Sequence, residues 1–381
     1  MTVTGSTPRV LVAPDKFKGT LTAVEAAAAI ADGVRDALPD ARVRELPIAD
    51  GGEGTVDAVV AAGGTRHTTL LAGPQGDPMP TRWASLGDQA VIELAAADGL
   101  QLLTPSRTSA LTAGSGRTGE LVRAALDAGF RRIVVGLGGS AGTDGGSGLL
   151  AALGARFLTA DDRPVGPGGG GLSHLARVDL TGLDPRLADC ELVLCCDVAS
   201  PLLGPTGAAA VFGPQKGAGP DEVVALEAGL ARLAAALRTA TGRDATAIDW
   251  GGAAGGVSGG LYAALDARFA PGVDYVCDLL GLDAHLADSD LVVVGEGRMD
   301  SSSLAGKAPV GVARRAAALG VPAVAVVGAL RLTEGAAADA GIRAVHSAVA
   351  EAGSADRALA EPPRWLRAAA RRAVSAAFTG S

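Results

Sequence analysis

The sequence predicts an α/β fold in which parallel sheets are joined by crossover helices. Short apolar runs alternate with longer segments of helical period, and glycine clusters follow several of the apolar runs. The chain has 381 residues, 48% of them hydrophobic and 19% charged, so it is long enough for two or three domains with cores of their own. Glycine is the unusual residue, because 55 copies are about twice its ordinary share.

The N-terminal residues predict the first strand–helix–strand unit. Residues 9–13 form an apolar run that Pro14 closes, which is typical of a buried strand. Thr22 is the expected N-cap of a helix over 23–38, and Glu25 completes a capping box with it. A second strand is expected over 43–48, and another helix after the loop 49–55.

Later segments repeat this plan. Buried strands are expected at 131–136, 290–295 and 322–330, each with a helix after it. The residues from about 72 to 110 carry shorter β-like runs, and the glycine run 166–171 predicts a loop or turn. These changes of composition indicate a second α/β domain inserted into the first.

Composition excludes several classes of protein. A net charge of −8 and only 3% aromatic residues argue against nucleic-acid binding. Neither a CxxC nor an HxxxH pair occurs, so zinc is not expected, and Cys195 and Cys196 fit buried packing in an apolar run. Without a signal-peptide pattern or an apolar run of about 20 residues, we expect a reduced, soluble, cytoplasmic protein, monomeric or homodimeric, without membrane partners.

Four glycine clusters carry the functional argument: residues 49–55, 136–148, 251–260 and 295–307. Glycine lets backbone amides approach an anion closely, and a helix N-terminus adds partial positive charge. The four clusters therefore predict a phosphate-handling enzyme, although tight turns are the alternative for any one of them. The spacing before Lys307 excludes a Walker A loop. Residues 136–141 fit a dinucleotide fingerprint, with Asp161 or Asp162 as its acid, which keeps a NAD-dependent oxidoreductase as an alternative.

Charged residues lie beside the same loops. The acids are Asp15, Asp50, Glu53, Asp144, Asp197, Glu296 and Asp300, and the cations are Lys16, Lys18, Lys216, Arg298 and Lys307. Acids at strand ends gather at one edge of an open α/β sheet, where ligands bind, although helix capping is the alternative for each. Acids able to hold Mg²⁺ and cations able to neutralise phosphate oxygens are what phosphoryl transfer requires.

Longer motifs strengthen this prediction. They are APDKFKGTLTA (13–23), PIADGGEGT (47–55), TGEL (118–121), GLGGSAGTDGGSG (136–148), CDVASPLLGPTGAAAVFGPQKGA (196–218), GAAGG (252–256) and GEGRMDSSSLAGKAPVGVA (295–313). With these motifs the chain resembles the first type of the bacterial glycerate kinase family from end to end. The resemblance implies ATP- and Mg²⁺-dependent phosphorylation of D-glycerate, usually at the 2-hydroxyl. It also implies a discontinuous Rossmann-like domain, placed at 1–70 plus 288–381, an inserted α/β domain at 71–287, and an active-site cleft between them.

Two positions depart from the family pattern. Arg117 stands where the family usually has glycine, and Thr143 where it often has asparagine. Either change could alter contacts with the acceptor or the nucleotide, so a same-fold kinase for another hydroxy acid or a larger metabolite stays an alternative. A binding protein without catalysis is the remaining one.

Roles follow for the matching residues. We expect Lys18 and Arg298 to hold the substrate carboxylate, and Asp197, or else Asp300, to accept the proton of the acceptor hydroxyl. Catalytic residues are expected to be Asp197, Asp300 and Lys18, and substrate-binding residues Lys18, Arg298, Ser301, Ser302, Lys307 and Asp50. The nucleotide is expected at Gly138, Gly139, Ser140, Asp144, Gly145, Gly255, Gly256 and Lys216, and Mg²⁺ at Asp144 or Glu296.

Overall fold

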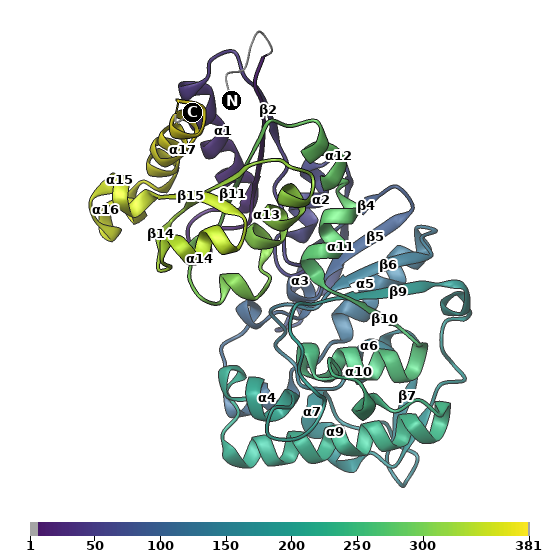
Figure 1. Ribbon diagram of the computed structural model, residues 1–381. Coiled ribbons are helices and arrows are strands. Elements are labelled where there is room, and N and C mark those ends of the chain that lie inside the picture. Colours follow the sequence, from purple (N-terminus) through teal and green to yellow (C-terminus); the bar gives the residue numbers. More distant parts are fainter. Residues whose placement is uncertain (1–6, 380–381) are drawn as a thin grey trace. The chain divides into compact units, whose positions relative to one another are not determined.

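The structure is a computed structural model that describes residues 7–379 (Figure 1). Its chain divides into two compact units. Within the described residues, unit 1 comprises 7–50, 57–63 and 272–379, and unit 2 comprises 51–56 and 64–271. Unit 2 therefore begins and ends earlier than the range 71–287 expected for an inserted domain. The expected C-terminal boundary was too late because α11 (Gly272–Leu279) and α12 (Leu282–Ala287) pack on α13 (Ala308–Ala318) of unit 1.

Unit 1 is built on a five-stranded parallel sheet with the order β15-β13-β11-β1-β2. Its strands are β1 (Arg9–Pro14), β2 (Arg42–Glu45), β11 (Leu291–Gly295), β13 (Ala323–Val327) and β15 (Ile342–Ser347). The predicted strand over 43–48 ends early, yet the amides of Leu46 and Ile48 still donate to carbonyls of β1. Helices cover the sheet, and smaller elements complete the unit: α2 (Thr55–Ala61, whose first two residues belong to unit 2), β12 (Arg298–Met299), β14 (Ala329–Leu330), α14 (Glu334–Asp339), α15 (Ala348–Ala352) and α16 (Ala355–Ala360).

The core of unit 1 lies between the sheet and two long helices. Thr22 caps α1 (Ala23–Ala37) and forms the predicted capping box with Glu25. α1 runs beside α17 (Pro362–Thr379), as Figure 1 shows. Alternate strand residues, among them Val10 and Val293, are buried against these helices. α13 contacts β1, β11 and β13 from the other side, so helices lie on both faces of the sheet.

The strand order of unit 1 reverses at β1. The chain leaves β1 through α1 to β2 on one side, whereas it leaves β11 through α13 to β13 on the other. In open α/β sheets such a reversal separates the two crossover connections, and ligands bind at the carboxyl ends of the strands there. A ligand site is thus expected at the carboxyl ends of β1 and β11.

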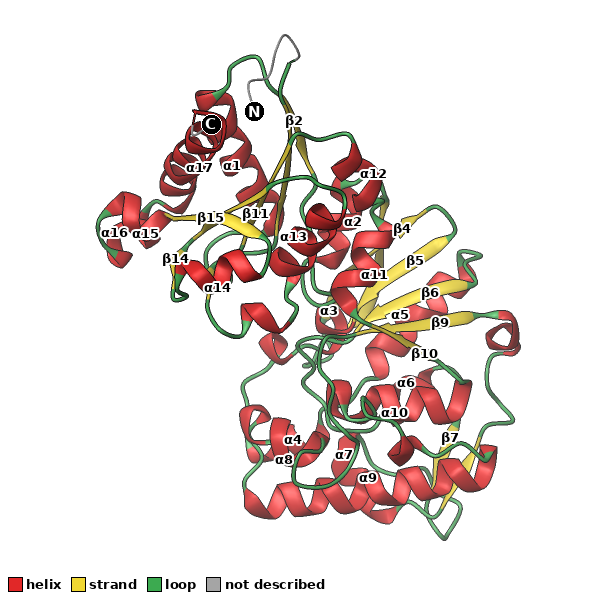
Figure 2. Cartoon of the chain, in the orientation of Figure 1, coloured by secondary structure: helices red, strands yellow, loops and turns green. Residues whose placement is uncertain are grey.

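Unit 2 contains a six-stranded mixed sheet with the order β10-β9-β6-β5-β4-β3 (Figure 2). The strands are β3 (Thr65–Ala72), β4 (Pro78–Leu86), β5 (Gln89–Glu93), β6 (Arg132–Gly136), β9 (Glu191–Cys195) and β10 (Arg268–Ala270). The pairs from β5 to β10 are parallel, and β3 and β4 add an antiparallel edge. β7 (Arg156–Leu158) and β8 (Arg177–Asp179) form a separate antiparallel pair. The helices are α3 (Leu94–Asp98), α4 (Arg107–Thr112), α5 (Gly116–Asp127), α6 (Ser147–Ala152), α7 (Gly168–Gly171), α8 (Ala208–Phe212), α9 (Pro220–Thr241) and α10 (Ala253–Leu265).

Glycines in unit 2 bring backbone segments into direct contact. A Cβ on Gly136 would overlap the carbonyl oxygen of Gly51, and one on Gly255 would overlap that of Gly142. Gly260 faces the carbonyl of Gly145 in the same way. The clusters 136–148 and 251–260 therefore pack against each other, and much of the glycine excess serves this close packing.

Two glycine segments differ from the sequence expectation. Residues 168–171, expected in a loop, form the single helical turn α7, which packs on α4 and α9. Residues 253–260, expected in a glycine loop, belong to α10, which is broken by left-handed backbone at 254–256. Sequence propensity disfavours glycine in helices, but here only glycine leaves room for the neighbouring backbone.

Within the described residues, the cysteines form no cross-link and the helices offer no candidate bilayer-spanning segment. The four cysteines are free, and the thiols of Cys195 and Cys277 are buried. Among the helices within residues 7–379, none combines the length and hydropathy that crossing a bilayer requires.

Packing of the glycine run can be tested by adding one methyl group. A Cβ on Gly169 would overlap the carbonyl oxygen of Thr143, whereas the nearest atom to a Cβ on Gly166 is 3.8 Å away. We expect Gly169→Ala to lower the free energy of unfolding by about 1–3 kcal/mol, and Gly166→Ala to change it by less than about 1 kcal/mol. Urea unfolding of both variants measures this. Equal effects of the two substitutions would contradict the packing described for α7.

Candidate active site

Two acids stand side by side where the strand order of unit 1 reverses. β1 and β11 pair in register with Pro14 opposite Gly295, so Asp15 and Glu296 each follow directly after their strand. The amide of Asp15 donates to the carbonyl oxygen of Gly295 at 2.8 Å, which extends the pairing by one residue. Both residues are buried. The register of the two strands thus brings together carboxylates that lie 281 residues apart in the chain.

Negative charge in this cluster is only partly compensated. Burial raises the pKa of the Asp15 carboxyl to about 7, and the nearby charge of Asp50 adds to the effect, while Lys16 opposes it. Burial also raises the pKa of Glu296, against a hydrogen bond from Ser303 and the charge of Lys307. The Oε1 atom of Glu296 is buried without a hydrogen-bond partner. A cation would satisfy this oxygen and relieve the repulsion, so the residues fit a divalent metal.

These acids do not form a complete metal-binding site by themselves. Within the described part of the chain, no three acidic, histidine or cysteine side chains stand at metal-binding spacing. Mg²⁺ commonly takes one or two carboxylates from a protein and completes its shell with water and substrate phosphates. Asp15 and Glu296 match that pattern.

Cationic side chains border the acids. Lys307 Nζ lies 3.8 Å from Glu296 Oε2, and Lys16 Nζ lies 3.6 Å from Asp50 Oδ1. Gly297 packs against the loop that follows β1, because a Cβ on Gly297 would come within 3.2 Å of the Lys18 amide nitrogen. This close approach brings the backbone of Lys18 next to that of Arg298, and both side chains are exposed. The backbone of Lys18 therefore lies beside the loop that carries Arg298.

Asp300 organises the serine loop. Its Oδ1 accepts hydrogen bonds from the amide of Ser302, at 3.0 Å, and from the Ser302 hydroxyl, while its own amide donates to Ser303 Oγ. The bonds from Ser302 hold the pKa of Asp300 below its usual range. A weakly basic, hydrogen-bonded carboxylate is a poor general base, which argues against the catalytic role expected of Asp300. Ser301 and Ser302 are exposed on this loop.

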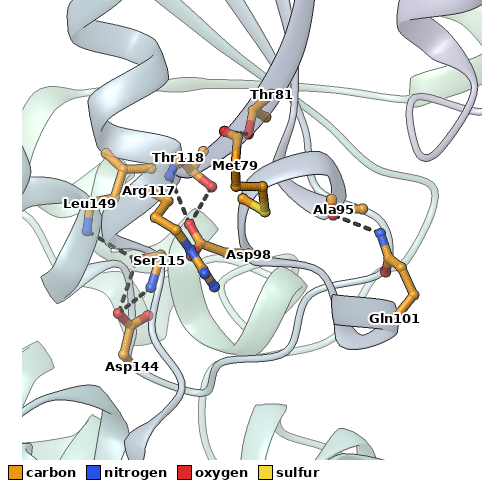
Figure 3. A network of polar contacts seen from close by, with 10 residues as sticks. All are labelled: Met79, Thr81, Ala95, Asp98, Gln101, Ser115, Arg117, Thr118, Asp144 and Leu149. Atoms are coloured by element: carbon orange, nitrogen blue, oxygen red, sulfur yellow. Dashed lines mark hydrogen bonds and ion pairs between the residues drawn. The ribbon is translucent and has the colours of Figure 1, made fainter. Parts of the chain in front are cut away.

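Asp144 has a structural position in unit 2 (Figure 3). Its Oδ2 accepts from the amide and hydroxyl of Ser115, both at 2.9 Å, and from the amide of Gly148 at 3.0 Å. Its Oδ1 accepts from the Gly146 amide at 3.1 Å. The side chain is fully buried and holds the start of α5 against the loop before α6. With four donors on its two oxygens, Asp144 fits a loop anchor better than the Mg²⁺ ligand we expected.

Lys216 is a buried cation in the same region. Its Nζ donates to Ser140 Oγ at 3.0 Å and to the carbonyl oxygen of Gly142, and only 2% of the residue is exposed. Burial lowers the pKa of its ammonium group to about 8, although the charge of Asp144 opposes the shift. At neutral pH the group stays protonated. A buried ammonium whose pKa is shifted by desolvation marks this region as a candidate functional site.

Several expected nucleotide contacts lie in this packed region. Gly138, Gly139, Gly145, Gly255 and Gly256 all meet neighbouring atoms closely enough that a side chain would crowd them. Ser140 is nearly buried and is already bonded to Lys216. The dinucleotide fingerprint finds no support, because no helix starts at residue 141 and α6 begins only at Ser147. Asp161 and Asp162 are exposed and pair with arginines.

Arg117 has a partner that the sequence did not reveal. Its Nε donates to Asp98 Oδ1 at 2.9 Å, and Asp98 Oδ2 accepts from the amide and hydroxyl of Thr118, both at 2.7 Å (Figure 3). Asp98 is 2% exposed, and burial raises the pKa of its carboxyl against these hydrogen bonds. No spacing rule links residues 98 and 117, so only the fold reveals this pair.

Asp197 lies just beyond β9, whose end is joined to the loop after β6 by a bond from the Leu137 amide to the Cys195 carbonyl, at 3.0 Å. Its side chain is exposed. The carboxyl ends of β6 and β9 thus carry Asp197 and the 137–146 loop at the same edge of the sheet of unit 2.

Burial of Lys216 makes stability depend on pH. Its pKa is about 8 in the folded chain and 10.5 ordinarily, so between these values the unfolded chain holds more protons. The stability that Lys216 contributes is therefore present above pH 10.5 and is lost as the pH falls through 8. We expect the unfolding free energy of the wild type, relative to Lys216→Met, to rise by about 2 kcal/mol between pH 8 and pH 10. Denaturant titrations at both pH values test this, and a constant difference would contradict the lowered pKa.

Comparison with known proteins agrees with the geometry. Residues 10–377 match the model of the glycerate kinase family. The glycerate kinase of Bacillus subtilis (strain 168) is 41% identical over 366 residues, covering 95% of this chain and 96% of that one. The glycerate 2-kinase of Escherichia coli (strain K12) is 42% identical over 354 residues, covering 92% and 93%. A crystal structure named "putative glycerate kinase 2", from Salmonella typhimurium LT2, superposes with a TM-score of 0.86 at 40% identity, covering 98% of this chain and 99% of that one. The chain belongs to the glycerate kinase family.

Proposed function

We propose that this protein transfers the γ-phosphoryl group of ATP to the 2-hydroxyl of D-glycerate. The observation that carries the proposal is the charged cluster where β1 and β11 end, which combines buried acids with exposed cations. The glycerate 2-kinase of Escherichia coli, 42% identical to this chain, supports the choice of hydroxyl. Phosphoryl transfer depends mainly on positioning and on charge neutralisation, and this cluster offers both.

Lys18 and Arg298 hold the substrate carboxylate in this proposal. Arginine donates to a carboxylate with two parallel N–H groups and so fixes its orientation as well as its position. Lys307, Ser301 and Ser302 supply further donors on the same loop. Asp50 keeps Lys16 in place through their ion pair and borders the same cluster.

Asp15 and Glu296 are the residues that would hold Mg²⁺. A bound Mg²⁺ would neutralise charge on the phosphate oxygens. The support is the Glu296 oxygen that lacks a partner and the raised pKa of Asp15, which reflects burial and neighbouring acids. Asp144, whose oxygens are occupied by hydrogen bonds, takes the role of organising its loop.

Asp197 remains the proposed general base for the acceptor hydroxyl. It lies exposed just beyond β9, at the sheet edge that also carries the 137–146 loop. The carboxylate of Asp300 accepts hydrogen bonds from Ser302, which hold its pKa below the usual range and make it a weaker base. Lys216 keeps the loop 140–142 in shape and places a positive charge beside it, which supports a role toward the nucleotide phosphates.

The substrate assignment has a direct test. We expect the purified protein with ATP and Mg²⁺ to release ADP in the presence of D-glycerate well above its rate without it. ³¹P NMR of the product is expected to show the phosphate on the 2-hydroxyl. ADP release that does not respond to D-glycerate would overturn the assignment, and a panel of other hydroxy acids would then identify the acceptor.

The base has its own test. Asp197→Asn is expected to lower kcat by about 10²- to 10⁴-fold, with little change in KM for ATP, because the proton acceptor is lost while binding is kept. Asp300→Asn is the matched control and is expected to retain kcat within about tenfold. Steady-state kinetics at saturating ATP measure both. An unchanged kcat in Asp197→Asn would remove Asp197 from the mechanism.

A further inference from the structure

A cavity of about 760 Å³ lies wholly within unit 2. Its lining residues fall between Ala72 and Gly168, so it is formed by the end of β3, by α4 and α5, by the β7 hairpin and by the turn before α7. None of the roles proposed above uses this space, apart from the buried anchor Asp144, which forms part of its wall. The cavity falls within the range of about 300–1,000 Å³ in which small-molecule sites are found.

The volume of the cavity indicates an occupant larger than glycerate. Glycerate has only seven non-hydrogen atoms and would leave most of this volume empty. A nucleoside, with its planar base and ribose, is of a size that the cavity can enclose. The cavity therefore fits the larger of the two substrates.

The chemistry of the walls narrows the choice further. Apolar side chains line part of it, namely Leu103, Phe157, Leu158 and Val165. Among the charged residues of the lining, three carboxylates (Asp98, Glu120 and Asp144) stand against the two guanidinium groups of Arg117 and Arg156. The surplus of carboxylates disfavours a triphosphate, whereas the apolar side chains favour the flat face of a base and the polar groups favour the hydroxyls of a ribose.

Arg117 gives the cavity a fixed polar wall. Its Nε is held by Asp98, and Asp98 is held in turn by the amide and hydroxyl of Thr118, so the guanidinium is anchored from behind (Figure 3). The Arg117 side chain is 19% exposed and that of Asp98 3%. Of the two, Arg117 is therefore the side chain that is more open to the cavity that both residues line. A guanidinium plane stacks well on aromatic rings and on nucleic-acid bases.

We propose that this cavity binds the nucleoside part of the phosphoryl donor, with the anchored guanidinium of Arg117 as a platform for the base. The inference rests on the proposed function, because it takes ATP as the donor. It assigns a specificity role to Arg117, the residue just before the TGEL segment (118–121), where this chain carries arginine in place of the usual glycine. The donor phosphates lie outside the cavity.

The inference is tested by placing a bulky side chain at an exposed residue that lines the cavity. Thr112 lies at the end of α4, is exposed and lines the cavity, whereas Thr108 is one turn earlier on the same helix, is exposed and does not line it. We expect Thr112→Trp to raise the Kd of Mg²⁺-ADP at least tenfold in calorimetric titration, and Thr108→Trp to leave it within twofold. Inorganic tripolyphosphate, which has no nucleoside, is expected to inhibit the wild type and Thr112→Trp equally. KM for glycerate is expected to stay unchanged in both variants.

Arg117→Met provides a second measurement should the tryptophan variant fail to fold. It keeps the length of the side chain but removes the planar cation, so the Kd of ADP is expected to rise several-fold while inhibition by tripolyphosphate stays as in the wild type. An unchanged Kd of ADP in both variants would place the nucleoside elsewhere and overturn the inference. So would an equal loss of tripolyphosphate binding, because the cavity would then serve the phosphates.

Failure of the proposed function looks different. A wild-type protein that binds ADP in the cavity but does not turn over glycerate would overturn the glycerate assignment and leave the nucleoside site intact. If the Thr112→Trp and Arg117→Met variants turn over glycerate and bind ADP with normal affinity, the glycerate assignment stands and the nucleoside site is overturned.

Discussion

The parallel pairing of β1 with β11 is the constraint on which the candidate active site depends. Because Pro14 stands opposite Gly295, the next residue of each strand is an acid at the same edge of the sheet. Two buried carboxylates in that position repel each other, and the raised pKa values of Asp15 and Glu296 follow from their burial and their neighbours. Lysines and an arginine on the adjoining loops supply positive charge, and this combination is what a phosphoryl-transfer site requires.

Unit 2 depends on a different constraint, which is the close approach of backbone to backbone. At the glycines 136, 145, 255 and 260, neighbouring backbone or side-chain atoms occupy the place that a Cβ would take. Asp144 fixes the loop 136–148 by accepting four hydrogen bonds. Interior packing is dense and tolerates little added volume, so these positions are held to glycine by geometry. The same compactness buries Lys216 and lowers the pKa of its ammonium group.

Much of the fold could be predicted because local signals agreed with it. The strand at 9–14, the capping box of Thr22 and Glu25, and the alternation of apolar strands with helices each follow from the sequence pattern. Glycine segments were the exception. Residues 168–171 form a helical turn and 253–260 a broken helix, because neighbouring backbone overrides the low helix propensity of glycine. The metal role expected of Asp144 loses support because Ser115, 29 residues away in the chain, donates two hydrogen bonds to its carboxylate, a contact that the sequence does not reveal. The base role expected of Asp300 loses support because the neighbouring Ser302 donates to its carboxylate.

The sequence by itself determined the α/β class, the charged residues at strand ends and membership of the glycerate kinase family, because these depend on residue type and on order along the chain. Tertiary structure alone decided which of those residues meet. In unit 1, Asp15 and Glu296 become neighbours through strand register. In unit 2, Arg117 meets Asp98 through the packing of α3 against α5, and the cavity that both residues line exists only in the folded unit. The physical reason is that burial and proximity, which set pKa values and vacant space, are properties of atoms that lie far apart in the chain.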